Sequence, residues 1–149
     1  MPDPIVESVH IDAPPHTVFE YFVRPEAMLR WMGEWAELEA TPGGAFRVDI
    51  RGVPVRGEYL EVDPPHRLRI SWGHAGSDRI PPGSSVLEVR LEDAAGGTTV
   101  TISHTGLPEP EATRHASGWT YFLDRLRAVA LTGTTPSADR SPGSAAAGQ

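Results

Sequence analysis

The chain has 149 residues, enough for one domain with a substantial core, and its 39% hydrophobic and 22% charged residues are ordinary for a soluble globular protein. Its formal net charge of −7 argues against a nucleic-acid partner, because binding to phosphates requires a basic surface. The absence of cysteine excludes disulfides and thiolate catalysis, and the absence of lysine excludes a Schiff base on a side chain.

The sequence carries no signal for a membrane or for secretion. No apolar run approaches the roughly 18 residues that span a bilayer. The first residues, MPDPIVESVHI, lack the basic and then apolar order of a secretory signal. We therefore expect no membrane partner and a cytoplasmic location.

The N-terminal part of the chain predicts one strand followed by two short helices. Residues 5–11 alternate apolar and polar side chains, which is typical of a strand. Residues 13–15, Ala-Pro-Pro, open a helix that ends before Pro25, because proline is tolerated in a first helical turn. Residues 25–32 then predict a second short helix.

The middle of the chain predicts a series of strands joined by short connections. Each of the following segments alternates or lies between turn signals: 35–40, 46–51, 55–63, 67–72, 86–92 and 98–105. A loop rich in glycine and proline at 73–83 could form a lid. Because the connections are short, neighbouring strands are expected to be antiparallel.

The long helical pattern at 108–131 follows the strands. Its apolar side chains recur at helical spacing: Trp119, Phe122, Leu123, Leu126, Val129 and Ala130. A lone helix laid over a curved sheet tends to enclose a space, and this space is where we expect function. Residues 132–149 have almost no large apolar side chain and predict a disordered tail after a single domain at 1–131.

Several segments together resemble one known family. They are residues 11–32, the turn and strand at 43–46, residues 57–72, residues 98–107, and the Gly118-Trp119 pair with Leu123 and Leu126 behind it. The chain resembles the activator of heat-shock protein 90 ATPase homologue family, within the START-like superfamily that also contains polyketide cyclases, lipid-transfer START domains and birch-pollen allergens.

The resemblance covers about residues 5–131 and implies a fold of the α+β class. This is the helix-grip fold, a curved antiparallel sheet of six to seven strands packed around a long C-terminal helix, with two short helices after the first strand. It also implies a central hydrophobic cavity. It brings no catalytic residues, because the motifs that the family shares are turns and packing positions.

The candidate site is the space between the long helix and the sheet. His115, Trp119 and Phe122 share about one helical face, and the small Gly118 would let the sheet or a ligand approach closely. The simpler interpretation is that Trp119 fills the core. We predict the following ligand-binding residues: Phe46, Val48, Tyr59, Trp72, Arg79, His104, His115, Trp119, Phe122 and Leu126.

Two of these residues have a clear structural alternative. His104 shares a strand face with Val100 and Ile102, so it is either an acid, a base or a ligand anchor, or else a hydrogen-bonded core histidine. Arg79, in the loop at 73–83, either binds an acidic ligand group or lies exposed.

Other residues are weighed in the same way. Trp31 and Trp35 are expected to pack beneath the short helix, and Glu58 to face solvent, although a Glu58 turned into the cavity could act as a general base. His104 and His115 lack a third metal ligand at suitable spacing, so we predict no metal and no cofactor.

The leading hypothesis is a protein that binds a small apolar or aromatic molecule, rather than an enzyme. One alternative is a co-chaperone that stimulates a heat-shock protein 90 ATPase, with that chaperone as its partner. Another is an enzyme like the polyketide cyclases that uses His104, His115 or Glu58. Motifs of nucleotide-binding proteins, serine hydrolases and zinc proteases do not occur. The sequence leaves the oligomeric state open.

Overall fold

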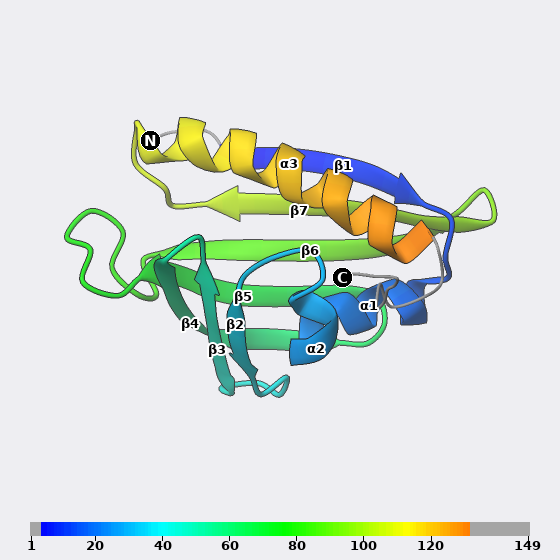
Figure 1. The fold of residues 1–149 in the computed structure, drawn as a ribbon, viewed down its shortest axis with the longest axis horizontal. Helices are drawn as coiled ribbons and strands as arrows, with labels where there is room; N and C mark the ends of the chain where they lie inside the picture. Colours follow the sequence, from blue (N-terminus) through cyan, green and yellow to red (C-terminus); the bar gives the residue numbers. More distant parts are fainter. Residues whose placement is uncertain (1–3, 132–149) are drawn as a thin grey trace.

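In the computed structural model, which describes residues 4–131, a curved antiparallel sheet packs against one long helix and two short ones (Figure 1). The elements are, in chain order, β1 (Ile5–Ile11), α1 (Pro15–Val23), α2 (Pro25–Met28), β2 (Trp35–Leu38), β3 (Ala45–Ile50), β4 (Val53–Asp63), β5 (Arg67–His74), β6 (Ser85–Ala94), β7 (Gly97–Thr105) and α3 (Glu111–Leu131).

The sheet has seven strands in the order β1-β7-β6-β5-β4-β3-β2. Between β2 and β7, each strand pairs with the one that follows it in sequence. Strand β1 pairs with β7, so that Ile5 lies opposite His104 and Ile11 opposite Thr98. The segment that contains α1 and α2 therefore connects one edge of the sheet to the other. The predicted α+β helix-grip architecture is confirmed.

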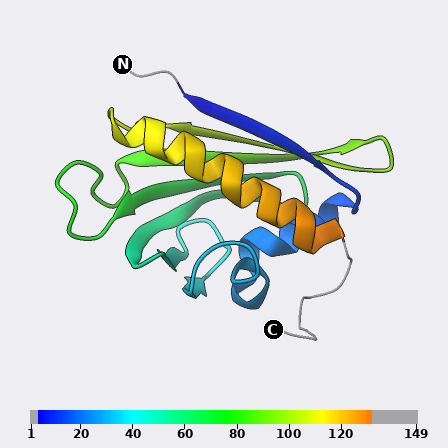
Figure 2. The ribbon, with the colours of Figure 1, turned by 45° about the horizontal axis from the view of Figure 1, so that its top comes forward.

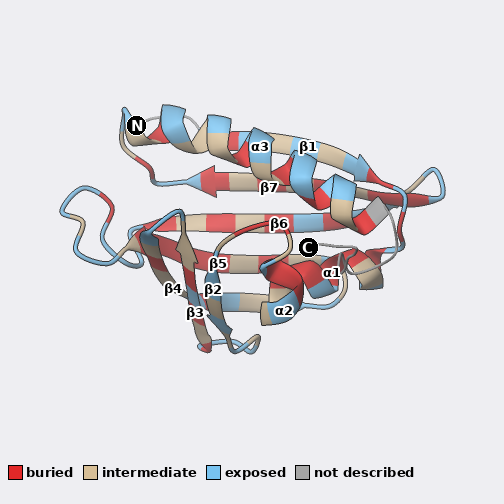
Figure 3. Ribbon diagram, viewed as in Figure 1, coloured by how far each residue is buried: buried red, intermediate tan, exposed pale blue. Residues whose placement is uncertain are grey.

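Helix α3 crosses one face of the curved sheet, as the turned view in Figure 2 shows. Thr120, Asp124 and Arg127 are exposed on its outer side. Figure 3 shows buried and exposed residues alternating along the helix. Burial of the apolar stripe, at about 25 cal/mol per Å² removed from water, holds the helix on the sheet. The buried side chains of this stripe are Trp119, Leu123, Leu126 and Ala130.

The two short helices close one end of the space beneath α3. Trp31 follows α2, is completely buried, and meets Phe22 of α1 edge to face with ring centroids 5.1 Å apart. Its Nε1 donates a hydrogen bond to the Tyr21 carbonyl at 2.9 Å. Arg125 of α3 donates to the Trp31 carbonyl at 3.2 Å, which ties this end to the long helix.

One packing expectation was wrong. Trp35 does not pack beneath a short helix, because it begins the edge strand β2 and is 45% exposed. Its indole ring is instead covered by the guanidinium of Arg56, whose Cζ lies 5.4 Å from the ring centroid.

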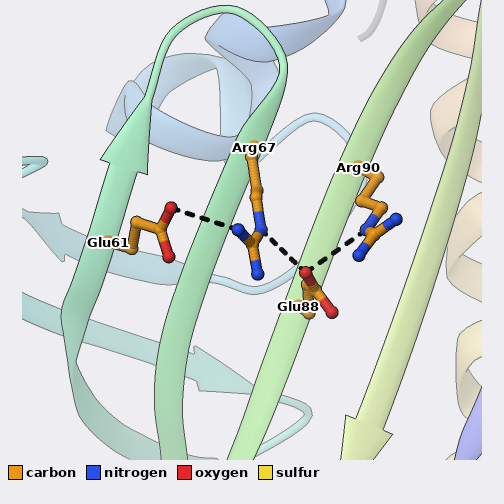
Figure 4. A network of polar contacts seen from close by, with 4 residues as sticks. All are labelled: Glu61, Arg67, Glu88 and Arg90. Carbon is orange, nitrogen blue, oxygen red and sulfur yellow. Dashed lines mark hydrogen bonds and ion pairs between the residues drawn. The ribbon is translucent and has the colours of Figure 1, made fainter.

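The face of the sheet opposite α3 carries charged side chains. Figure 4 shows a network that runs across three strands, from Glu61 on β4 through Arg67 on β5 to Glu88 and Arg90 on β6. Arg67 Nε lies 2.8 Å from Glu88 Oε2, and both Arg67 to Glu61 and Arg90 to Glu88 measure 3.3 Å. The apolar residues of these strands lie on the other face of the sheet, beneath α3.

Several element boundaries differ from the predictions, most by one or two residues, and three of the differences affect the region around the site. Strand β5 continues to His74, into the segment predicted as a loop. Helix α2 ends at Met28 and continues to residue 32 only as turns. Helix α3 begins at Glu111, three residues later than predicted, because Pro108 and Pro110 precede it. The predicted disordered tail at 132–149 lies outside the described residues. No helix within residues 4–131 is long and apolar enough to cross a membrane.

Candidate functional site

An open pocket of about 200 Å³ lies between α3 and the region where β3, β4 and β5 meet. Its surface is mainly apolar, and most of its polar groups come from two histidines and two arginines. The lining residues are Met32, Ile50, Arg51, Val53, Val55, Trp72, His74, Arg114, His115, Gly118, Trp119 and Phe122. The central hydrophobic cavity that the family resemblance implies stays a prediction.

Strand and helix periodicity explain how the two walls form. Trp72 and His74 are two residues apart on β5 and so share one face of the sheet, and Val55 of β4 lies opposite His74. On α3, His115, Gly118 and Phe122 recur at helical spacing and so share one face of the helix.

Gly118 lies in the middle of α3, where a glycine is unusual. A Cβ built on Gly118 would meet no atom within 4 Å outside its own helix. The missing side chain is therefore not needed for a close approach of the sheet. Its effect is to leave open space at the helical wall of the pocket.

His104 lies behind the pocket in a continuous chain of hydrogen bonds. Trp119 Nε1 donates to His104 Nδ1 at 3.0 Å, so this nitrogen carries no hydrogen. The hydrogen is then on Nε2, which donates to Ser85 Oγ at 3.0 Å, and Ser85 donates to the Trp72 carbonyl at 2.8 Å. The chain links both tryptophans of the pocket wall through one buried histidine.

The surroundings of His104 keep its ring neutral. The side chain is only 1% exposed, and burial, with smaller contributions from His115 and His74, lowers its pKa from 6.5 to about 3. Protonation of His104 would also place a hydrogen on Nδ1, so that Trp119 Nε1 would lose the acceptor of its hydrogen bond. His104 is therefore a hydrogen-bonded core histidine, one of the two alternatives open from the sequence.

His74 and His115 form a stacked pair in the pocket wall. Their ring centroids are 5.5 Å apart and their planes differ by 20°. Burial lowers the pKa of each, and His115 lowers that of His74 further. His115 Nδ1 lies 3.0 Å from the Glu111 carbonyl and must donate to it, which leaves Nε2 with a lone pair on a residue that lines the pocket.

Arg51 sits at the tip of the β3–β4 hairpin. Arg51 and Gly52 both have positive φ values, 52° and 81°, as a two-residue turn of the type I′ kind requires. The guanidinium lies over the rings of Tyr121 and Phe122, at 4.7 Å and 5.4 Å from their centroids. Arg51 and, after it, Arg125 lower the pKa of the Tyr121 phenol.

The structure brings together only part of the predicted ligand-binding set. Trp72, His115, Trp119 and Phe122 line the pocket, and His104 lies behind it. Arg79 is on the exposed loop after β5, where it pairs with Glu111 at 2.8 Å and donates to the Glu109 carbonyl. Four residues are fully buried in the core and not on the pocket surface: Phe46, Val48, Tyr59 and Leu126.

Sequence reasoning missed most of the rim. His74 was assigned to a loop, although it shares the inward face of its strand with Trp72, which was a usable signal. Arg51 and Arg114 showed no such signal, since each looks like an ordinary surface arginine. Glu58 is exposed, as expected. Within residues 4–131, no three His, Asp or Glu side chains come together in a group that could hold a metal ion.

Several known proteins are similar to this chain in sequence and in fold. The AHSA1-like protein of Rhizobium etli is 44% identical, with a TM-score of 0.70, and the match covers 88% of this chain and 84% of that one. CalU16 from Micromonospora echinospora is 29% identical, with a TM-score of 0.67, and the match covers 83% of this chain and 73% of that one.

DynU16, from the dynemicin biosynthetic locus, is 27% identical, with a TM-score of 0.77. The match covers 90% of this chain but only 49% of DynU16, so this chain spans about half the length of that protein. The chain matches no curated protein sequence. Residues 12–130 match the family model described as "Activator of Hsp90 ATPase homolog 1-like protein". Because this match extends over most of the sequence, the chain belongs to the activator of Hsp90 ATPase homolog 1-like family.

Proposed function

We propose that the protein binds a small apolar or aromatic molecule in the pocket between α3 and the sheet. The pocket volume is about 200 Å³. A dry cavity of about 150 Å³ is known to bind benzene, so this pocket suits a single ring with a few further atoms. The mainly apolar wall would supply most of the binding free energy, through burial of the ligand surface.

Gly118 is the observation that carries the proposal. Glycine inside a helix destabilises it by about 0.5–1 kcal/mol relative to alanine. An added Cβ would meet no atom of the sheet or of another helix within 4 Å, so the close approach of another element does not demand glycine at this position. The gain that offsets the lost helix stability is the pocket volume that a side chain would fill.

The hydrogen-bonded chain behind the wall supports a preformed site. Trp72 and Trp119 are held on the two sides of His104, and their ring centroids lie 5.5 Å apart. A wall that is already fixed needs little reordering when a ligand enters, which favours binding. Trp72 Nε1 is itself buried without an acceptor among the described residues.

Titration with toluene, followed by the indole N–H signals of Trp72 and Trp119 in NMR spectra, tests the proposal. Saturable shifts of both signals are expected. Gly118→Leu should abolish them, because its side chain would occupy the pocket. Ser117→Leu is the matched control, since Ser117 is the exposed neighbour on α3 and the same side chain there lies outside the pocket. Absence of saturable shifts in the unaltered protein, or undiminished binding by Gly118→Leu, would contradict the proposal.

Family membership favours a second candidate function, stimulation of an Hsp90 ATPase through the protein surface. Val53 and Tyr121, near the pocket rim, are 37% and 46% exposed and could supply apolar contacts to a chaperone. The measurement is the rate of ATP hydrolysis by Hsp90 with and without the chain. An unchanged rate would rule this function out, and a raised rate should fall again with Tyr121→Ser.

A further inference from the structure

We infer that the ligand is an anion: a small aromatic or branched aliphatic carboxylate whose charged group is bound at the pocket rim by Arg51 and Arg114. The inference rests on the proposed function and narrows its ligand class. It comes from the two arginines in the pocket lining, which form no ion pair with any residue in the described part of the chain, although the protein is acidic overall.

The charge balance of the chain makes unpaired arginines informative. Asp and Glu together number 20 against 13 basic residues, all of them arginine. Seven arginines of residues 4–131 have an ion pair with a carboxylate: Arg24, Arg47, Arg56, Arg67, Arg79, Arg90 and Arg127. In that part of the chain, Arg51 and Arg114 have none, although both line the same pocket.

Two acidic side chains near Arg51 and Arg114 are engaged by other donors. Glu34 accepts hydrogen bonds from the backbone N–H groups of Arg51 and Gly52, at 2.8 Å and 3.2 Å. Glu111, one turn before Arg114 on α3, pairs with Arg79 at 2.8 Å. Neither glutamate forms an ion pair with Arg51 or Arg114, although the charge of Arg114 contributes to the lowered pKa of Glu111. The guanidinium N–H groups of the two arginines therefore have no carboxylate at ion-pair distance within residues 4–131.

The position of Arg51 suits the recognition of a carboxylate. Its guanidinium lies over the rings of Tyr121 and Phe122. A guanidinium that packs by its face keeps N–H groups along its edge, and these match the two oxygens of a carboxylate. The aromatic contacts also limit the conformational freedom of the Arg51 side chain, so less conformational entropy is lost when it binds a ligand.

The histidines of the wall do not supply this charge near neutral pH. Burial lowers the pKa values of His74 and His115, so both are neutral there and the rim charge comes from the arginines. An apolar interior with a cationic rim fits a molecule with one apolar part and one negative group. The pocket volume of about 200 Å³ limits the apolar part to about one ring.

Two ligands of nearly the same shape isolate the charge: 4-methylbenzoate and the neutral 4-methylbenzamide, each titrated calorimetrically against the whole chain. We expect the carboxylate to bind about tenfold tighter than the amide, as charge-assisted hydrogen bonds to one or two arginines imply. Arg51→Asn and Arg114→Gln should each weaken carboxylate binding about tenfold and leave amide binding unchanged. Asparagine is chosen at position 51 because it tolerates the positive φ of the turn.

Arg69→Gln is the matched control. Arg69 lies on the sheet face opposite α3 and has no ion-pair partner within residues 4–131, so its replacement changes the net charge without touching the pocket. Equal affinity for both ligands would overturn the anion inference while the proposed function stands. An equal loss of carboxylate affinity in Arg69→Gln would show a long-range charge effect and would also overturn it. If neither ligand binds, the proposed function itself fails. Should Arg51→Asn not fold, the exposed Arg114 still provides the test.

Discussion

The buried His104 should make the stability of the fold depend on pH in a defined window. Its pKa is lowered from 6.5 to about 3, mainly by burial. Above pH 6.5 the ring is neutral in the folded and the unfolded chain, so its contribution to stability is complete. As the pH falls below 6.5, only the unfolded chain binds the proton, and stability is lost until the pH reaches about 3.

The size of the effect follows from linkage. Each pH unit within that window changes the free energy of unfolding by about 1.4 kcal/mol, so His104 alone removes about 2 kcal/mol between pH 6.5 and about pH 5. His74 and His115 have lowered pKa values and act in the same direction. The lowered carboxyl pKa values of Glu88 and Glu111 matter only below about pH 4.5, outside this range.

His104→Gln isolates the contribution of this one residue. The glutamine amide can accept from Trp119 and donate to Ser85, so it preserves the hydrogen-bonded chain but does not titrate. Urea unfolding, followed by far-ultraviolet circular dichroism at about pH 7.5 and about pH 5, gives the free energy of unfolding of both proteins. The unaltered protein should lose about 2 kcal/mol more than the variant over this interval.

Equal losses in the two proteins would refute the reasoning. If His104→Gln does not fold, NMR titration of the unaltered protein provides the same test. The ring signals of His104 should then stay constant from about pH 7.5 to about pH 5. A titration midpoint near the ordinary histidine pKa would show that the His104 ring can be protonated in the folded protein, contrary to the prediction.

Three further predictions concern other parts of the structure. Gly118→Ala should raise the free energy of unfolding by about 0.5–1 kcal/mol and weaken toluene binding, as urea unfolding and NMR titration would measure; a loss of stability would contradict the open space found there. Tyr59→Phe should lower the free energy of unfolding by about 1 kcal/mol, because the buried Phe22 carbonyl loses the hydrogen bond it accepts at 3.0 Å; an unchanged urea midpoint would show that this bond contributes nothing. Glu88→Gln should lower the free energy of unfolding by about 1 kcal/mol at neutral pH and reduce the loss of stability below about pH 4.5. Burial raises the pKa of Glu88, but hydrogen bonds from Arg67 and Arg90 outweigh burial and lower the pKa overall, so the stabilising contribution of Glu88 disappears as the pH falls; identical acid unfolding of both proteins would refute this.

The architecture could be predicted from the sequence because its elements follow simple periods. Strands with one buried face alternate apolar and polar residues, and α3 repeats its apolar residues at helical spacing, so the order of the elements could be predicted from these periods alone. The helix-grip arrangement of those elements was predicted from the family resemblance. The boundaries were less predictable. His74 was assigned to a loop that begins at Gly73, but pairing with Val55 and a backbone hydrogen bond to Ile80 extend β5 through it.

The pocket lining was harder to predict than the fold, because alternation shows which face a residue occupies but not how deep it lies. Phe46 and Tyr59 point to the face beneath α3, as expected, yet both are fully buried in the core. The rim depends on where a hairpin tip meets a helix. Nothing in the local pattern around Arg51 indicates that its side chain will lie over Tyr121, seventy residues away in sequence.

The histidines His104 and His115 looked equivalent in the sequence, but the structure separates what each can do. His104 uses both ring nitrogens, for Trp119 and Ser85, so it cannot bond a ligand without breaking a hydrogen bond of the core. His115 uses only Nδ1, for the Glu111 carbonyl, and its Nε2 keeps a lone pair. Burial lowers both pKa values, so both rings are neutral near pH 7. Of the two, only His115 can accept a hydrogen bond from a bound ligand that carries a hydroxyl group as well as its carboxylate. A proton transfer in this pocket would therefore involve His115 or its stacked neighbour His74, and His104 would act only by holding the two tryptophans in place.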